Sequence, residues 1–216
     1  ASTTSAAATL VFNALSNAYT GTTTFNATTD QYAGGTTNLS GLPGSIVIPG
    51  NLTINGGATV TMNTNQGQIA STSNVTINGS GVLNLVGTNT LNSLTFNNSG
   101  GNAAPTIGLG TSGVLNLTSA TPITATNDNT GFTPTFTNTT SGTLNLTSAT
   151  GATINVSGQS LNGVNLNFTS ITSVGTITKT GTGSLILNNA QAASLTWALN
   201  GGWIFVGNAT ALGTNA

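Results

Sequence analysis

The chain contains 216 residues, of which 37% are hydrophobic and only 1% are charged. The charged side chains are Asp30, Asp128 and Lys179, and there is no Glu, Arg, His or Cys. A formal net charge of −1 excludes the electrostatic attraction to nucleic acid or to an anionic membrane surface that basic proteins have. So few titratable groups also leave no residues for a conventional zinc site, thiol site or catalytic triad. The sequence therefore predicts a protein that is not an enzyme and needs no cofactor.

No apolar run reaches the roughly 20 residues that a membrane-spanning helix needs, so we expect no direct membrane insertion. The absence of Cys is compatible with secretion, as in bacterial surface proteins that lack disulfides. A typical soluble protein has about a quarter of its residues charged, and a chain without that protection tends to self-associate. Composition alone thus favours a homo-oligomer.

Residues 1–44 are the least regular part of the chain. Short strands are predicted at 10–12 and 22–25, whereas residues 34–44 have the Gly, Pro and Asn content of turns. We therefore expect residues 1–44 to form less regular N-terminal coils or a cap, and residues 45–216 to form a regular β-structured region.

From Ser45 onward, apolar residues alternate with small polar ones. Alternation with period two places both members of a pair on one face of a β-strand, and the runs are too short for helices. The pairs are Ile46/Ile48, Leu52/Ile54, Val60/Met62, Val75/Ile77, Leu83/Leu85, Leu94/Phe96, Ile107/Leu109, Leu115/Leu117, Leu144/Leu146, Ile154/Val156 and Leu185/Leu187.

Two direct repeats set the period. NLTINGGATVTM (51–62) recurs as NVTINGSGVLNL (74–85) at an offset of 23 residues, and SGVLNLTSAT (112–121) recurs as SGTLNLTSAT (141–150) at an offset of 29. Repeats of this length predict the stacked coils of a β-solenoid, with roughly nine or ten coils of about 20–25 residues. We expect turn Asn side chains to form ladders between coils. Because the second offset is longer, we predict a protruding loop at 125–140.

The segment at 175–213, GTITKTGTGSLILNNAQAASLTWALNGGWIFVGNATALG, resembles the autotransporter-associated β-strand repeat of bacterial surface proteins. The matching positions are Gly175, Ile177, Lys179, Gly181, Gly183, Leu185, Leu187, Gly202, Ile204, Val206, Gly207 and 211–213. The Tyr-x-Gly-x-Thr part of the repeat is missing from 190–201. A weaker likeness to the Asn-x-Tyr-x-Gly-x-Thr part of the repeat lies at 17–27, and the rest of the chain resembles autotransporter passenger domains in composition.

This resemblance implies an all-β, right-handed parallel β-helix that is exported and displayed on the outer cell surface. Nothing at the C-terminus resembles a translocator barrel, so we expect a fragment, a processed passenger domain or a subunit that assembles in another way.

Few residues are candidates for chemistry. Asp30 and Asp128 lie several coils apart, so we expect two turn formers that do not meet. Lys179 matches the family's lysine, and we expect a solvated ammonium or one that caps a corner beside backbone carbonyls. If Ile204 and Val206 point inward, alternation turns Trp203 and Phe205 outward. These two aromatic residues then either contact a neighbouring subunit or surface, or are covered by a cap or loop.

We therefore predict a non-catalytic extracellular rod or filament subunit that associates end to end or side to side. A first alternative is a β-solenoid that binds ice or a host or surface glycan through Thr-x-Thr arrays, although their irregular spacing does not assure a flat face. A second is a β-sandwich, pilin-like subunit that donates a strand from residues 1–25 to a neighbour.

Overall fold

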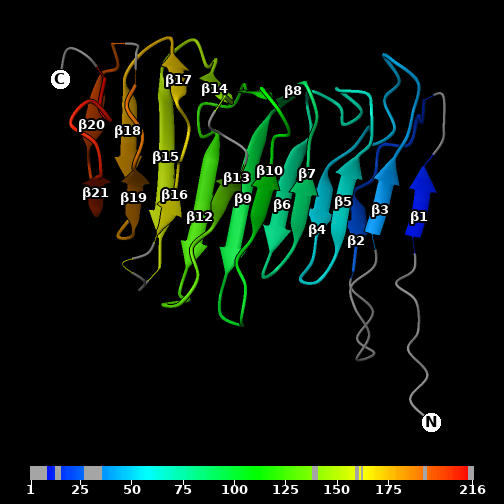
Figure 1. Ribbon diagram of the computed structural model, residues 1–216, viewed down its shortest axis with the longest axis horizontal. Coiled ribbons are helices and arrows are strands. Elements are labelled where there is room, and N and C mark those ends of the chain that lie inside the picture. Colours follow the sequence, from blue (N-terminus) through cyan, green and yellow to red (C-terminus); the bar gives the residue numbers. More distant parts are fainter. Residues whose placement is uncertain are drawn as a thin grey trace.

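The computed structural model describes residues 9–12, 16–26, 36–137, 141–158, 161, 163–191 and 194–213. These residues form β-strands and no helix, and every pair of neighbouring strands is parallel. Figure 1 shows the strands side by side along one axis, with β1 at one end and β20 and β21 at the other. The predicted parallel β-solenoid is confirmed.

The strands form three sheets. Sheet A contains β1 (Thr9–Phe12), β3 (Thr36–Leu39), β5 (Thr59–Met62), β7 (Val82–Asn84), β10 (Thr106–Gly108), β13 (Thr135–Thr137), β16 (Val164–Asn165), β19 (Ser184–Leu187) and β21 (Trp203–Val206). Sheet B contains β2 (Thr23–Phe25), β4 (Leu52–Ile54), β6 (Asn74–Asn78), β9 (Ser93–Asn98), β12 (Ile123–Asn127), β15 (Ala152–Ser157), β18 (Ile177–Thr180) and β20 (Trp197–Leu199). Sheet C contains β8 (Thr88–Leu91), β11 (Val114–Leu117), β14 (Thr143–Leu146) and β17 (Ser170–Ser173).

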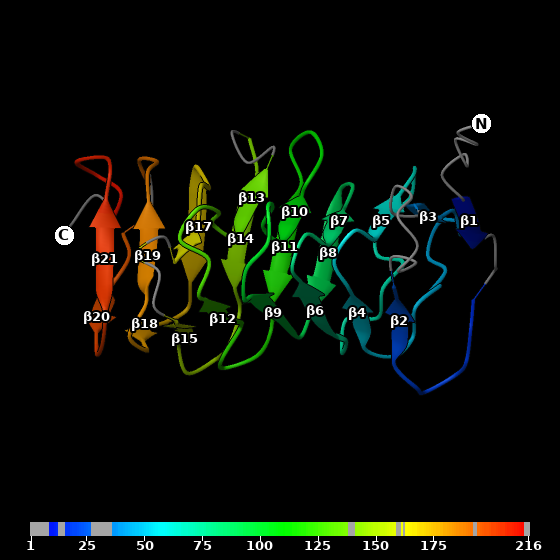
Figure 2. The same cartoon turned by 90° about the horizontal axis from the view of Figure 1, so that it is seen from below.

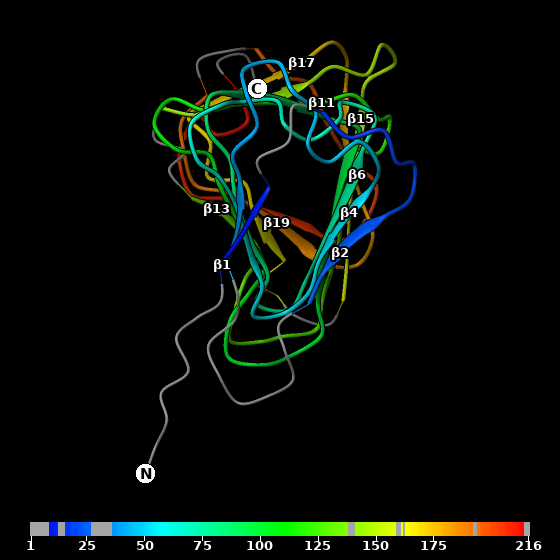
Figure 3. The same cartoon turned by 90° about the vertical axis from the view of Figure 1, so that its right-hand side faces the viewer.

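Each complete coil passes through sheets A, C and B in that order, as β7, β8 and β9 do. Figure 3 looks along the axis from the end that carries β1, and the chain circles clockwise as it recedes, so the solenoid is right-handed. Figure 2 shows the same stacking from a second side. The β-sandwich alternative is wrong, because the sheets are parallel and β1 pairs with β3 of its own chain.

Inward side chains stack into columns because strands of successive coils pair in register. One column of sheet B illustrates this, since each of its members pairs with the next: Leu52, Val75, Leu94, Ile123, Ile154, Lys179 and Leu199. The hydrophobic members from Leu52 to Ile154 are at most 1% exposed. In the middle of the rod the core also contains an aromatic cluster, in which Phe136 lies edge-on to Phe96 and tilted against Phe168.

Coil length varies without disturbing this register. The first five residues of that column are separated by 23, 19, 29 and 31 residues. The longest coils take up their extra residues between sheets B and A, in the loops that follow β9, β12 and β15. Because these coils are long, the rod has somewhat fewer coils than the nine or ten predicted.

Three local predictions are wrong. Residues 34–44 were expected to be turns, but β3 lies within them and Leu39 is buried. The predicted loop at 125–140 holds the end of β12 and all of β13, so only 128–134 connects these two strands. At 45–48, Val47 and Ile48 are buried in place of the predicted Ile46/Ile48 pair. In each case hydrogen bonding to a neighbouring coil accompanies the observed conformation.

Candidate functional surfaces

A column of threonines follows the outer face of sheet B. Strand pairing places at equivalent positions Thr24, Thr53, Thr76, Thr95 and Thr124. Thr24 is exposed and the others are half-buried. Neighbouring strands of a sheet are ~4.8 Å apart, so the hydroxyl and methyl groups recur at that interval along the axis. The irregular spacing of Thr in the sequence is therefore compatible with a regular column, because the variable loops absorb the difference.

An asparagine ladder runs beside this threonine column, two residues further along each strand. Asn55 donates a hydrogen bond to Asn26, Asn78 Nδ2 donates to Asn55 Oδ1 at 2.6 Å, and Asn97 Nδ2 donates to Asn78 Oδ1 at 2.8 Å. A second ladder lies on sheet C, where Asn145 Nδ2 donates to Asn116 Oδ1 at 2.8 Å. The predicted Asn ladders are confirmed, and many of their members lie within strands as well as at turns.

Lys179 lies inside the solenoid and is 0% exposed. Its side chain starts in the apolar column of sheet B and turns to the corner between sheets B and A. There Nζ donates to the carbonyl oxygens of Thr180 at 2.6 Å, Gly181 at 3.1 Å and Gly201 at 3.1 Å. The corner-capping prediction is confirmed and the solvated alternative is wrong. Burial lowers the pKa of the ammonium from its ordinary value of 10.5.

Two coils donate the carbonyls that hold Lys179. Thr180 ends β18 and Gly181 follows it, whereas Gly201 belongs to the next coil, so the ammonium joins the last two coils. Gly202 has a φ of 67°, and a Cβ there would lie 3.0 Å from Nζ and would collide with the Gly183 carbonyl. Four positions of the motif, Lys179, Gly181, Gly183 and Gly202, thus form one structural corner.

The other positions of that motif line the same two coils. Ile177, Leu185 and Leu187 are 0% exposed and point inward. Ile204 and Val206 pair with Leu185 and Leu187 and occupy the same inward columns. Gly175, Gly183 and Gly207 lie in the connections beside these strands.

The C-terminal end of the rod exposes apolar side chains. On β21, Trp203 is 55% exposed and Phe205 is 45% exposed, and both lie on the outward face. Val206 is an inward residue, yet it is 47% exposed. Leu199, the last residue of the inward column of sheet B that contains Lys179, is 55% exposed. Their equivalents one coil earlier are fully buried. The described residues after β21 do not cover these groups.

The structure also contains a buried cluster of Asn side chains that the sequence analysis does not predict. Asn98, Asn127 and Asn129 are 0%, 0% and 7% exposed. Asn98 Nδ2 donates to Asn127 Oδ1 at 2.9 Å, and Asn127 Nδ2 donates to the Gly163 carbonyl at 3.1 Å. The cluster ties together the long loops after β9, β12 and β15. The signal was present, because Asn98 continues the inward alternation of Leu94 and Phe96.

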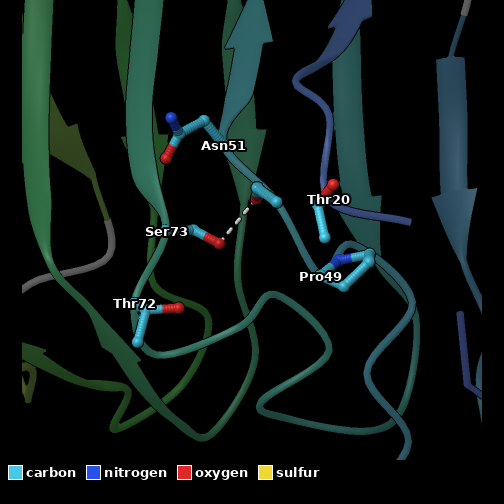
Figure 4. Close-up of a pocket in the computed structure, with 6 residues that line it drawn as sticks. Thr20, Pro49, Asn51, Thr72 and Ser73 are labelled. Carbon is cyan, nitrogen blue, oxygen red and sulfur yellow. Dashed lines mark hydrogen bonds between the residues drawn. The ribbon is translucent and has the colours of Figure 1, made fainter. Parts of the chain in front are cut away.

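A shallow hollow lies at the corner before β4 and β6 (Figure 4). Its lining is polar and uncharged, with Thr20, Pro49, Asn51 and Thr72 around it. Ser73 Oγ donates to the Gly50 carbonyl at 2.6 Å, so this hydroxyl fastens two coils together. The hollow is open and contains no group that could act as a general acid or base.

The expectation that Asp30 and Asp128 do not meet stays a prediction. Asp128 is exposed at the start of the loop after β12, and Asp30 lies outside the described residues. In the described part of the chain, no cluster of three His, Cys, Asp or Glu side chains could hold a metal ion. That same part also contains no helix of the length and hydrophobicity needed to cross a membrane.

No family model matches this chain, and searches of curated proteins and of solved structures likewise find nothing similar. The fold is that of a β-helix repeat protein. The likeness of residues 175–213 to autotransporter passengers therefore rests on the motif alone.

Proposed function

We propose that the protein is a structural β-helical rod that works outside the cell, as an adhesive stalk or as a filament unit, and has no catalytic role. The observation that carries this proposal is the continuous parallel pairing of sheet A from β1 to β21. Every strand between these two is hydrogen-bonded on both sides. Such a sheet distributes a mechanical load over many backbone hydrogen bonds and resists local unfolding.

The chemistry of the surface supports the same role. Most outer positions of the sheets hold Thr, Asn or Ser, and the single cation is used inside the rod to hold three carbonyls. The outside therefore has almost no charge that salt or pH could modulate. A rod of this kind keeps its shape and its contacts when ionic conditions outside a cell change.

The proposal is tested on the purified 216-residue chain by small-angle scattering and electron microscopy. Nine strands at ~4.8 Å spacing give a rod ~40 Å long for each chain. We expect this shape, and the far-ultraviolet β signal, to persist from pH 4 to pH 9. A compact globule, or loss of the β signal near pH 4, contradicts the proposal.

The extracellular location is supported by the absence of Cys and by the motif at 175–213. It is tested by labelling intact cells that express the natural protein with a membrane-impermeant reagent that reacts with amines at an added lysine tag. Labelling only after lysis contradicts a surface location and leaves the rod itself unaffected.

The threonine column favours a second candidate function, which is binding of ice or of a glycan by the outer face of sheet B. The column is regular over five coils and is flanked by the Asn26–Asn97 ladder. A repeating array of hydroxyl, methyl and amide groups matches a repeating ligand surface better than it matches a small molecule.

This candidate is tested by comparing two lysine substitutions on outward threonines. Thr95→Lys interrupts the column on sheet B, whereas the control Thr143→Lys lies at a half-buried outward position of sheet C. Thermal hysteresis or glycan-array binding that Thr95→Lys abolishes and Thr143→Lys preserves supports the binding face. If the parent protein shows neither thermal hysteresis nor glycan binding, this candidate function is ruled out.

A further inference from the structure

The outermost described strand at each end of the rod belongs to the same sheet. Sheet A begins with β1 and ends with β21, and each has one paired neighbour in the described part of the chain. Both strands are four residues long, with the sequences TLVF and WIFV. An apolar edge strand with free backbone groups is a template for pairing with another strand.

In both edge strands the second and fourth residues lie at inward positions of sheet A. Ile204 and Val206 end inward columns of sheet A. At the opposite end, Leu10 and Phe12 lie at register positions that lead, through β3, to the inward residues Val60 and Met62. The parity of the two strands therefore allows one to continue the columns of the other without turning a side chain to the wrong face.

Apolar side chains are exposed at both ends of the described rod. Val206 is 47% exposed, whereas its column neighbour Leu187 is 0% exposed. On the outward face, Phe205 is 45% exposed at the C-terminal end and Val11 is 53% exposed on β1. Neither edge strand carries a charge, so no like charges oppose contact between them.

We propose that β21 of one copy pairs in parallel with β1 of a second copy, in the register Trp203 to Thr9 through Val206 to Phe12. This pairing rests on the proposed function as a rod and names its partner, a second copy of this chain. Sheet A then runs from one copy into the next. The contact joins two different surfaces, so it generates an open head-to-tail filament and not a closed dimer.

The order of the strands along the chain limits the strand pairing between copies to sheet A. Along the chain β1 precedes β2 and β21 follows β20. When β21 of one copy pairs with β1 of the next, one strand position in sheet B therefore stays empty between β20 of the first copy and β2 of the second. Backbone hydrogen bonds along sheet A supply affinity, and the apolar columns supply the register, as in other cases of strand addition. Association should therefore depend on hydrophobic side chains of β21 and be insensitive to salt.

The register is tested by disulfide cross-linking, because the chain contains no Cys. In the proposed register Val11 and Phe205 are neighbours in one outward column, and paired strands ~4.8 Å apart fall within the Cα separation that a disulfide allows. We expect the double variant Val11→Cys, Phe205→Cys to form a ladder of covalent oligomers under mild oxidation.

The matched control is Val11→Cys, Trp203→Cys, in which the second thiol is displaced by two residues. Its Cα separation in the proposed register is ~8 Å, beyond disulfide reach, so we expect about tenfold less cross-linking. Far-ultraviolet circular dichroism checks that both variants keep the β signal. A control that cross-links as well as the first variant overturns the register.

A second test measures association without cysteines. We expect Phe205→Lys to weaken self-association about tenfold in sedimentation, whereas Phe132→Lys, at a 41% exposed aromatic residue away from the ends, leaves it unchanged. Filaments without the Val11–Phe205 cross-link overturn this pairing but not the rod. Rods that stay monomeric at high concentration overturn the pairing with a second copy but remain compatible with a stalk. A globular particle overturns both the pairing and the rod.

Discussion

The central coils and the C-terminal coils follow the same pattern but bury it to different extents. From β6 to β15 the inward hydrophobic residues are enclosed by a coil on each side, and Ile77, Phe96, Ile123 and Val156 are 0% exposed. At β20 and β21 equivalent inward positions hold Leu199 and Val206, which are 55% and 47% exposed. The strand pattern decides which way a residue points, whereas burial requires a further coil. Stability should therefore fall from the middle of the rod toward this end.

The comparison predicts the largest effect for the aromatic cluster. Phe136→Ala should lower the free energy of unfolding by about 3–5 kcal/mol, because a buried ring that packs on Phe96 and Phe168 is removed and leaves a cavity. Val206→Ala should cost less than about 1 kcal/mol, since half of that side chain already contacts solvent. Urea unfolding followed by circular dichroism measures both values. Equal losses at low protein concentration would contradict the difference between the two regions.

The buried amide cluster should give the next largest effect. Asn127→Ala should cost about 1–3 kcal/mol, because one N–H of Asn98 loses its acceptor and the Gly163 carbonyl loses its donor in the interior, although Asn98 keeps its hydrogen bond to the Phe132 carbonyl. We also expect faster hydrogen exchange in the loops after β9 and β12, which the cluster ties together. A variant as stable as the parent would show that water replaces the lost hydrogen bonds.

Lys179 tests how much its hydrogen bonds stabilise the last two coils relative to the central ones. Lys179→Met should cost about 1–3 kcal/mol near neutral pH, because three carbonyls lose their donor. Burial lowers the folded-state pKa, so between that pKa and 10.5 the unfolded chain binds more protons than the folded one. The free energy of unfolding of the parent should therefore rise with pH as the pH approaches 10.5.

The methionine variant has no such group and should show no rise in this window. The measurement is urea unfolding at a series of alkaline pH values for both proteins. A rise of equal size in the two would assign the pH dependence to another group and would contradict the buried position of Lys179.

A small effect is expected for the amide ladder of sheet B, whose members are exposed or half-buried. Asn78→Ala removes one donor and one acceptor at an accessible position, so we expect a loss of about 0.5–1.5 kcal/mol. Thr76→Ala on the same strand serves as the control for strand propensity. A loss of unfolding free energy as large as that of Asn127→Ala would mean that the ladder is as well shielded from water as the interior cluster.

Much of the fold could be predicted from the sequence because β-strand alternation is local. The pairs Val75/Ile77 and Leu94/Phe96 predict both a strand and the face that is buried, and the 23-residue repeat predicts stacking in parallel. The errors arose where this signal is weak. Residues 36–39, TTNL, contain one large apolar side chain, and their strand exists because β1 and β5 pair with it on either side.

The candidate surfaces were predicted less completely. Alternation was sufficient to turn Trp203 and Phe205 outward on β21. The threonine column was not recognised, because its members are unevenly spaced in the chain and become equivalent only through strand pairing. The Asn98–Asn127 contact likewise joins residues 29 positions apart, and its burial depends on three loops that meet.

The sequence by itself determined an uncharged, parallel β-solenoid, the inward columns of the regular strands, and a surface of Thr and Asn. These properties follow from side-chain alternation and from composition, which every short segment carries independently. Only the tertiary structure decided the register between coils of unequal length, the enclosure of Lys179 by carbonyls of two coils, and the exposure of Leu199 and Val206. Each of these depends on residues about 20 or more positions apart, whose proximity arises only when one coil lies against the next.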